Sequence, residues 1–69
     1  MKKLKIKDEY IKLGQAMKLA GLVSSGLEAK LVILNGEVSV NNETCLMRGK
    51  KLYIKDCFEY DNQVFKIEW

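Results

Sequence analysis

The stretch from Gly21 to Asn42, GLVSSGLEAKLVILNGEVSVNN, constrains the fold most, because a helix start, a helix end and a strand follow one another in it. Ser25 precedes Glu28 by three residues, the spacing at which a hydroxyl and a carboxylate together cap the free N–H groups of a first helical turn. Asn35-Gly36 supplies residues that tolerate the left-handed conformation at a helix end. The stretch therefore predicts a helix that begins near Ser25, stops at Asn35-Gly36 and leads into a strand over 38–40, where valine alternates with serine.

This predicted helix is apolar on every side. Its leucines share one face, and smaller or β-branched residues lie away from that face. We expect the helix to pack on both sides, with one face against another helix and the other against a sheet. The leucine face consists of Leu27, Leu31 and Leu34, and the remaining apolar residues are Ala29, Val32 and Ile33.

The spacing of apolar residues changes once in the segment before Gly21. Lysines alternate with apolar residues over Lys3–Lys7, which predicts a short edge strand whose lysines either discourage edge-to-edge association or contact an anionic partner such as RNA. From Lys12 the spacing becomes helical, and a first helix is expected to end at Gly21. Only a few residues then separate the two helices, so they should turn back on each other. The apolar face of the first helix consists of Leu13, Ala16, Met17 and Ala20.

The remaining chain is rich in strand and turn signals. Asn41-Asn42 predicts a tight turn, and residues 57–67 predict a closing hairpin around Asp61-Asn62. Residues 48–51 form a basic loop with a glycine hinge, and Trp69 is expected to pack on the core. We therefore predict a single domain over residues 1–69, of the α+β class, with two packed helices against a small, mostly antiparallel sheet.

The sequence lacks the residues that several classes of function require. A chain of 69 residues buries only about 60% of its unfolded surface, which leaves little room for an internal catalytic cavity. The chain has no histidine to activate a nucleophile and no glycine-rich nucleotide-binding loop. Cys45 and Cys57 are interpreted as structural thiols, and Asp8-Glu9 as a solvated pair. We predict no enzyme, no cofactor and no metal site, and, without a signal peptide or membrane span, a cytoplasmic protein.

Positive charge is unevenly distributed along the chain. Eleven of the 12 basic side chains lie in residues 1–55 with five of the nine acidic ones, for a net charge of +6 there, and residues 56–69 carry −3. Such an asymmetry favours an anionic partner on one side of the protein.

Basic and small polar residues form three clusters that the predicted fold can bring together. They suit the phosphates and 2′-hydroxyls of structured RNA. Gly26 leaves backbone N–H groups open at a helix start, where a phosphate is favoured. The alternative is that Gly26 belongs to a simple capped turn without a role in binding. Ordinary solubilising lysines remain the alternative for the charges. The clusters are Lys12 and Lys18, then Ser24, Ser25, Gly26 and Lys30, then Arg48, Lys50 and Lys51.

The order of these residues resembles the RNA-binding domain named after small-subunit ribosomal protein S-four, whose two helices and following strand form the αL motif. The matching segments are Lys12-Leu13, Gly21-Leu22-Val23-Ser24-Ser25, Ala29-Lys30 and Gly36-Glu37-Val38-Ser39-Val40-Asn41-Asn42. Nearly the whole chain is similar to the small stand-alone bacterial members of YaaA-like type. Asn42 stands where the family has a glycine.

The resemblance implies docking on structured RNA, commonly ribosomal or transfer RNA. From the matching positions we expect RNA contacts at Lys12, Ser24, Ser25, Gly26, Lys30, Arg48, Lys50 and Lys51, and also at Gln15 and Lys18. Our leading hypothesis is a monomeric protein that recognises structured RNA, in particular ribosomal RNA, in ribosome assembly or function. The rival hypothesis is a protein-interaction adaptor that uses the same basic scaffold for an acidic partner.

Overall fold

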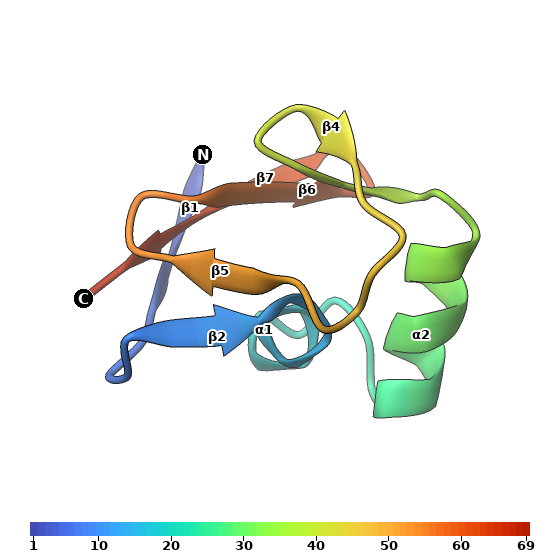
Figure 1. Cartoon of the computed structure of the whole chain (residues 1–69), viewed down its shortest axis with the longest axis horizontal. Helices are drawn as coiled ribbons and strands as arrows, with labels where there is room; N and C mark the ends of the chain where they lie inside the picture. The colour runs from blue at the N-terminus through green and yellow to red at the C-terminus, as the bar shows by residue number, and fades with distance from the viewer.

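A computed structural model describes all residues, 1–69, and arranges them as two helices against two small sheets (Figure 1). The five-stranded sheet crosses the upper part of the view in Figure 1, and both helices lie below it. The elements are β1 (Lys2–Lys5), β2 (Tyr10–Lys12), α1 (Leu13–Leu19), α2 (Gly26–Leu34), β3 (Val38–Val40), β4 (Glu43–Thr44), β5 (Lys51–Tyr53), β6 (Cys57–Tyr60) and β7 (Gln63–Glu68).

The larger sheet has the strand order β1-β7-β6-β3-β4, and the smaller one pairs β2 with β5. Only β1 and β7 run parallel; every other pair is antiparallel. The predicted α+β class with a mostly antiparallel sheet is confirmed, and the lysine-rich β1 lies at a sheet edge as expected.

Tight turns close two hairpins where the sequence predicted them. Asn41 and Asn42 have φ of 49° and 72°, and Asp61 and Asn62 have φ of 53° and 63°. Positive φ at both central positions is the type I′ geometry, whose twist matches that of the flanking strands. Asparagine and aspartate adopt it at lower cost than other non-glycine residues, so Asn42 can replace the glycine of the family pattern.

Strand β2, which leads into α1, was not predicted from the sequence. Tyr10 pairs with Tyr53 and Lys12 with Lys51, so β2 is held by a strand about 40 residues later in the chain. The tyrosine rings pack at a centroid distance of 5.8 Å. Three residues show no measurable alternation, and only this long-range pairing makes them a strand.

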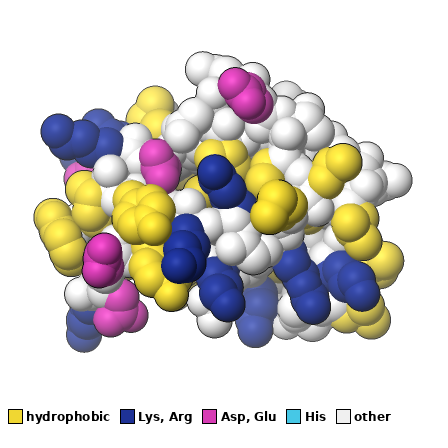
Figure 2. All heavy atoms as spheres, in the orientation of Figure 1, with side chains coloured by type: hydrophobic (Ala, Val, Ile, Leu, Met, Phe, Trp, Pro, Cys, Tyr) yellow, Lys and Arg dark blue, Asp and Glu magenta, His cyan; other side chains and the backbone are white.

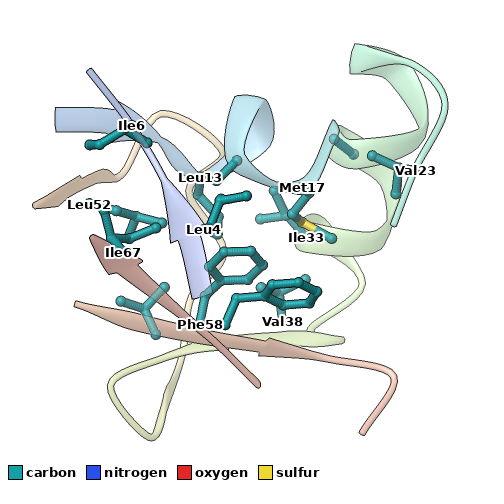
Figure 3. Close-up of a cluster of buried hydrophobic side chains, with 14 residues drawn as sticks. Leu4, Ile6, Leu13, Met17, Val23, Ile33, Val38, Leu52, Phe58 and Ile67 are labelled. Atoms are coloured by element: carbon teal, nitrogen blue, oxygen red, sulfur yellow. The ribbon is translucent and has the colours of Figure 1, made fainter. Parts of the chain in front are cut away.

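The core consists of apolar side chains from both helices and from β1, β3, β5, β6 and β7 (Figure 3). Phe58 and Phe65 stack at its centre on the sheet side, with ring centroids 5.3 Å apart and planes inclined by 13°. No polar or charged residue is buried. The largest fully buried side chains are Phe58, Leu13, Met17, Ile33, Leu52, Ile67 and Val38.

Helix α2 packs on one side only, which contradicts the expected two-sided packing. Ala29 and Ile33 are buried, whereas Leu27, Leu31 and Leu34 are 65%, 58% and 56% exposed. The side chains of Ala29 and Ile33 join one cluster with residues of both α1 and the sheet. Because α1 and the sheet are contacted from the same side of α2, the leucine face has no layer to cover it.

The expectation for Trp69 was also wrong, since the residue is 67% exposed. Ile67, two residues earlier in β7, is fully buried, whereas the strand ends at Glu68 and Trp69 lies beyond it.

Cys45 and Cys57 are free thiols, each half-buried. Nowhere do three or more cysteine or carboxylate side chains gather as metal ligands would. Neither helix has the length and apolar character needed to cross a membrane.

Candidate nucleic-acid interface

The basic loop meets the start of α1 because backbone hydrogen bonds join these two segments. The N–H of Leu13 donates to the carbonyl of Lys50 at 2.8 Å, and the N–H of Gly14 donates to the carbonyl of Arg48 at 3.0 Å. The first turn of a helix has free N–H groups, and here the basic loop satisfies two of them. This contact holds the loop against α1.

Helix α2 approaches the same place beside Gly14. A Cβ at this position would lie 3.6 Å from the Cβ of Arg48 and 3.8 Å from the Cβ of Ala29 on α2. These are ordinary van der Waals distances, so the backbone at Gly14 lies beside both the basic loop and α2 without its glycine being required for the contact. Gly14 was not among the predicted site residues, although a glycine in the first turn of a helix is an unfavourable position that the sequence makes visible.

These segments enclose a hollow of about 330 Å³, called the basic hollow below. It has no hydrophobic and no acidic lining residue, which distinguishes it from an ordinary gap between packed elements. Its lining residues are Lys12, Gly14, Gln15, Lys18, Gly26, Arg48 and Gly49. Five of the ten predicted site residues, Lys12, Gln15, Lys18, Gly26 and Arg48, therefore do come together.

Two further predicted lysines border the basic hollow without lining it. Lys51 is the cross-strand partner of Lys12, so both side chains leave the same face of the β2–β5 sheet. The ammonium of Lys51 lies 4.7 Å from the ring centre of Tyr10. Lys30 is one helical turn after Gly26 on α2 and is exposed. Figure 2 shows the resulting row of basic side chains along the lower part of the molecule, from the β2–β5 sheet to α2.

The structure places the other predicted residues elsewhere. Lys50 lines a different hollow, of about 470 Å³, beside the β3–β4 turn. Ser25 caps α2: its hydroxyl accepts the N–H of Glu28 at 3.1 Å. The carboxylate of Glu28 accepts from the N–H of Ser24 at 2.6 Å and from its hydroxyl at 3.0 Å. The serine hydroxyls are thus used in a capping box, and the anion nearest the start of α2 is the protein's own.

Part of the helix start stays open despite this cap. The N–H of Glu28 is taken by Ser25 and the N–H of Ala29 by the Ser25 carbonyl. The N–H groups of Gly26 and Leu27 have no partner within the chain, and Gly26 lies in the wall of the basic hollow. A phosphate in the hollow could therefore accept from the helix start as well as from cationic side chains.

Acidic side chains line a separate hollow of about 350 Å³ between the start of β3 and the β6–β7 turn, which includes Glu37, Glu59 and Asp61. Burial, and next the Glu37 and Asp61 carboxylates, raises the pKa of the Tyr60 hydroxyl. Opposite charges thus occupy different hollows of a molecule with extents of only 29 × 22 × 18 Å. A polyanion is attracted to the basic hollow and repelled by this second region.

The α2 cap makes stability depend on pH. Hydrogen bonds from the Ser24 N–H and, secondarily, from its hydroxyl hold the pKa of Glu28 below its ordinary value of 4.5. A carboxyl whose pKa is lower in the folded state stabilises the fold above its unfolded pKa and stops doing so as pH falls through the folded pKa. We expect Glu28→Gln to lower the unfolding midpoint at pH 7, and this difference from wild type to shrink as the pH falls below 4.5 and the Glu28 carboxylate becomes protonated.

Ser25→Ala is the matched comparison, because it removes the other half of the cap without removing a titrating group. It should cost about 1 kcal/mol, with little change over the same pH range. Thermal unfolding followed by circular dichroism at pH 3, 5 and 7 measures both variants. A Glu28→Gln difference that persists undiminished at pH 3 would contradict this account of the cap.

The fold and the basic hollow define the chain as a small α+β module with a concentrated cationic surface, a class of protein suited to docking on an anionic polymer. The family model described as the S4 domain matches residues 4–68. The chain belongs to the S4 domain family, which confirms the resemblance to the S-four-type domain.

The chain is also similar over most of its length to a named bacterial protein. The chain is 43% identical over 58 residues to a protein of Bacillus subtilis (strain 168) named "Probable ribosome maturation protein RlbA". The aligned region covers 84% of this chain and 82% of that protein, so the similarity extends over most of both.

Proposed function

We propose that this protein binds structured RNA, in particular ribosomal RNA, through the basic hollow, and takes part in ribosome assembly or function. The observation that carries the proposal is a hollow lined only by polar residues and glycine, built from α1, the start of α2 and the basic loop. S4 domain membership and the name of the Bacillus subtilis relative support the same assignment.

Recognition by this surface depends on phosphate and ribose contacts. Lys12, Lys18 and Arg48 supply charge, Gln15 can donate and accept, and Gly26 offers a backbone N–H group. A double-stranded RNA is read mostly through its shape, its 2′-hydroxyls and its phosphates, and these groups match that chemistry. Under this proposal the protein acts as a monomer in the cytoplasm, by docking and without catalysis.

The proposal is tested by titrating the protein with folded ribosomal RNA fragments and with an unstructured RNA of equal length, across a salt series. With about four phosphates contacted, the logarithm of the binding constant should fall with the logarithm of salt concentration with a slope of roughly −3 to −4. Folded RNA should bind more tightly than unstructured RNA. Weak binding without preference would refute the proposal.

A second candidate function is a protein-interaction adaptor, and the exposed leucine face of α2 favours it. Leu27, Leu31 and Leu34 are each more than half exposed, and Lys30 lies beside them on the same helix. Contiguous exposed apolar residues bordered by charge are typical of protein contacts. An adaptor that bound an acidic protein through the basic scaffold, as the sequence suggested, would capture its partner in a salt-dependent way, whereas one that used the leucine face would capture it with little salt dependence. Neither would prefer folded RNA in the titration above.

A further inference from the structure

Another hollow adjoins the basic hollow along the exposed side of α1. It measures about 670 Å³, within the range of roughly 300–1,000 Å³ that is common for small-ligand sites. Its walls come from the chain that links β1 to β2 and from the outer side of α1. Gln15 and Lys18 line both this hollow and the basic hollow, so one side-chain pair separates two adjoining spaces.

The two hollows differ in the chemistry of their walls. The basic hollow has no hydrophobic residue, whereas this second hollow has four: Ile6, Tyr10, Ile11 and Leu19. It also has three lysines, Lys5, Lys7 and Lys18, against one carboxylate, Asp8. A ligand that fits it needs a flat or apolar part together with negative charge.

We propose that this second hollow, called the nucleotide hollow below, receives one unpaired nucleotide of the RNA whose backbone occupies the basic hollow. The base would lie against Leu19, Ile11 and Tyr10, and its phosphate near Lys7 and Lys18. Unpaired bases in loops and bulges are the usual source of specificity in RNA recognition, and they are held by aromatic and apolar contacts. The inference rests on the proposed RNA-binding function and extends it from shape recognition to selection of an unpaired position.

The position of Leu19 supports this occupant. It is the last residue of α1 and 58% exposed, and it follows Lys18, which both hollows share. A single exposed leucine needs no explanation. Here, however, it forms an apolar wall beside three lysines, which attract a charged ligand rather than an apolar peptide. The excess of positive charge and the wall shared with the basic hollow both favour a nucleotide.

Tyr10 also connects the nucleotide hollow with the basic hollow, through its contact with Lys51. Its ring lines the nucleotide hollow and lies under the ammonium of Lys51, which is the cross-strand partner of Lys12 in the basic hollow. The same tyrosine packs against Tyr53 at 5.8 Å, which restricts its ring orientation. A preorganised ring binds a base at a lower entropic cost than a free one.

The test uses two RNA hairpins that share one stem and differ by a single unpaired 4-thiouridine. Wild type should bind the bulged hairpin about tenfold more tightly than the fully paired one, as expected for one stacked base. Irradiation should crosslink the thiouridine to residues 5–11 or 15–19, identified by mass spectrometry of the crosslinked peptides. Leu19→Ser should remove most of the tenfold preference and leave binding of the paired hairpin unchanged.

Leu31→Ser is the matched control, because Leu31 is also a helix leucine with 58% exposure and lines neither hollow. It should retain the preference. Lys7→Gln is a second variant in an exposed segment, and it should lower affinity for the bulged hairpin more than for the paired one. Circular dichroism confirms that each variant is folded.

The outcomes separate this inference from the proposed function. Equal affinity for both hairpins, or a preference that Leu19→Ser and Lys7→Gln leave intact, overturns the nucleotide hollow, while salt-dependent binding of both hairpins would still support RNA docking. Crosslinks confined to other segments overturn it as well. Failure to bind either hairpin overturns the proposed function and the inference together.

Discussion

Replacing Lys12 and Arg48 together with alanine is expected to weaken binding of folded ribosomal RNA by about two orders of magnitude at roughly 0.1 M salt. Both side chains line the basic hollow, which contains no carboxylate to compensate for them. Each lost phosphate contact should also make the salt dependence less steep by about 0.7 to 0.9 in the logarithmic slope. Fluorescence anisotropy with a labelled RNA across a salt series measures the affinity and the slope in one experiment.

The matched control is the double substitution of Lys3 and Lys66 with alanine. These two lysines are neighbours in β1 and β7, and they line neither the basic hollow nor the nucleotide hollow. The control changes net charge by the same amount as the test variant. Its affinity should fall much less. Equal losses in the two variants would mean that only overall charge matters and that the hollow is not the contact site.

The stability of the Lys12 and Arg48 variant should be close to that of wild type. Both side chains are exposed, and surface substitutions away from special features usually change stability by less than about 0.5 kcal/mol. The contact that holds the basic loop uses the backbone carbonyls of Arg48 and Lys50 rather than their side chains. A folded variant that keeps wild-type RNA affinity would therefore count directly against the proposed interface.

The second large effect concerns the fold. Ile33→Ala is expected to lower the free energy of unfolding by about 2–5 kcal/mol, because Ile33 is fully buried between α1 and the sheet and its loss leaves a cavity. A domain of this size has a total stability of roughly 3–10 kcal/mol, so the substitution should remove a large fraction of it. Urea unfolding followed by circular dichroism gives the difference.

Leu31→Ala tests the same helix from its other side. Leu31 is two residues from Ile33 and 58% exposed, so its truncation should change the free energy of unfolding by less than about 0.5 kcal/mol. The sequence pattern alone predicted that both residues are buried. A large loss for Leu31→Ala in the monomer would show that the leucine face is covered and that the packing of α2 described above is wrong.

Local signals in the sequence correctly predicted most of the fold. Ser25 and Glu28 set the start of α2, Gly36 with φ of 78° ends it, and the Asp61-Asn62 turn has the expected positive φ. Each of these signals acts within a few residues along the chain, through a cap, a turn or a period. Interactions of that range can be recognised without knowing where the rest of the chain lies.

The candidate site was predicted in part. The cationic residues were predicted from the sequence. It did not indicate that Lys50 lines another hollow or that the Ser24 and Ser25 hydroxyls take part in the α2 cap. It also did not indicate Gly14 as the point where the loop and α2 approach α1. Charge and residue type are visible in a sequence, whereas the direction in which a side chain leaves its element depends on the backbone around it.

The sequence by itself determined the helix limits, the turns, the uneven charge and the family. The tertiary structure decided which face of α2 is buried, that Trp69 is exposed, that Tyr10–Lys12 is a strand, and which of the basic residues share one hollow. An all-apolar helix has no preferred side, and a three-residue strand has no period of its own. Both acquire their roles only from partners distant in the chain, because burial and strand pairing are properties of neighbours in space.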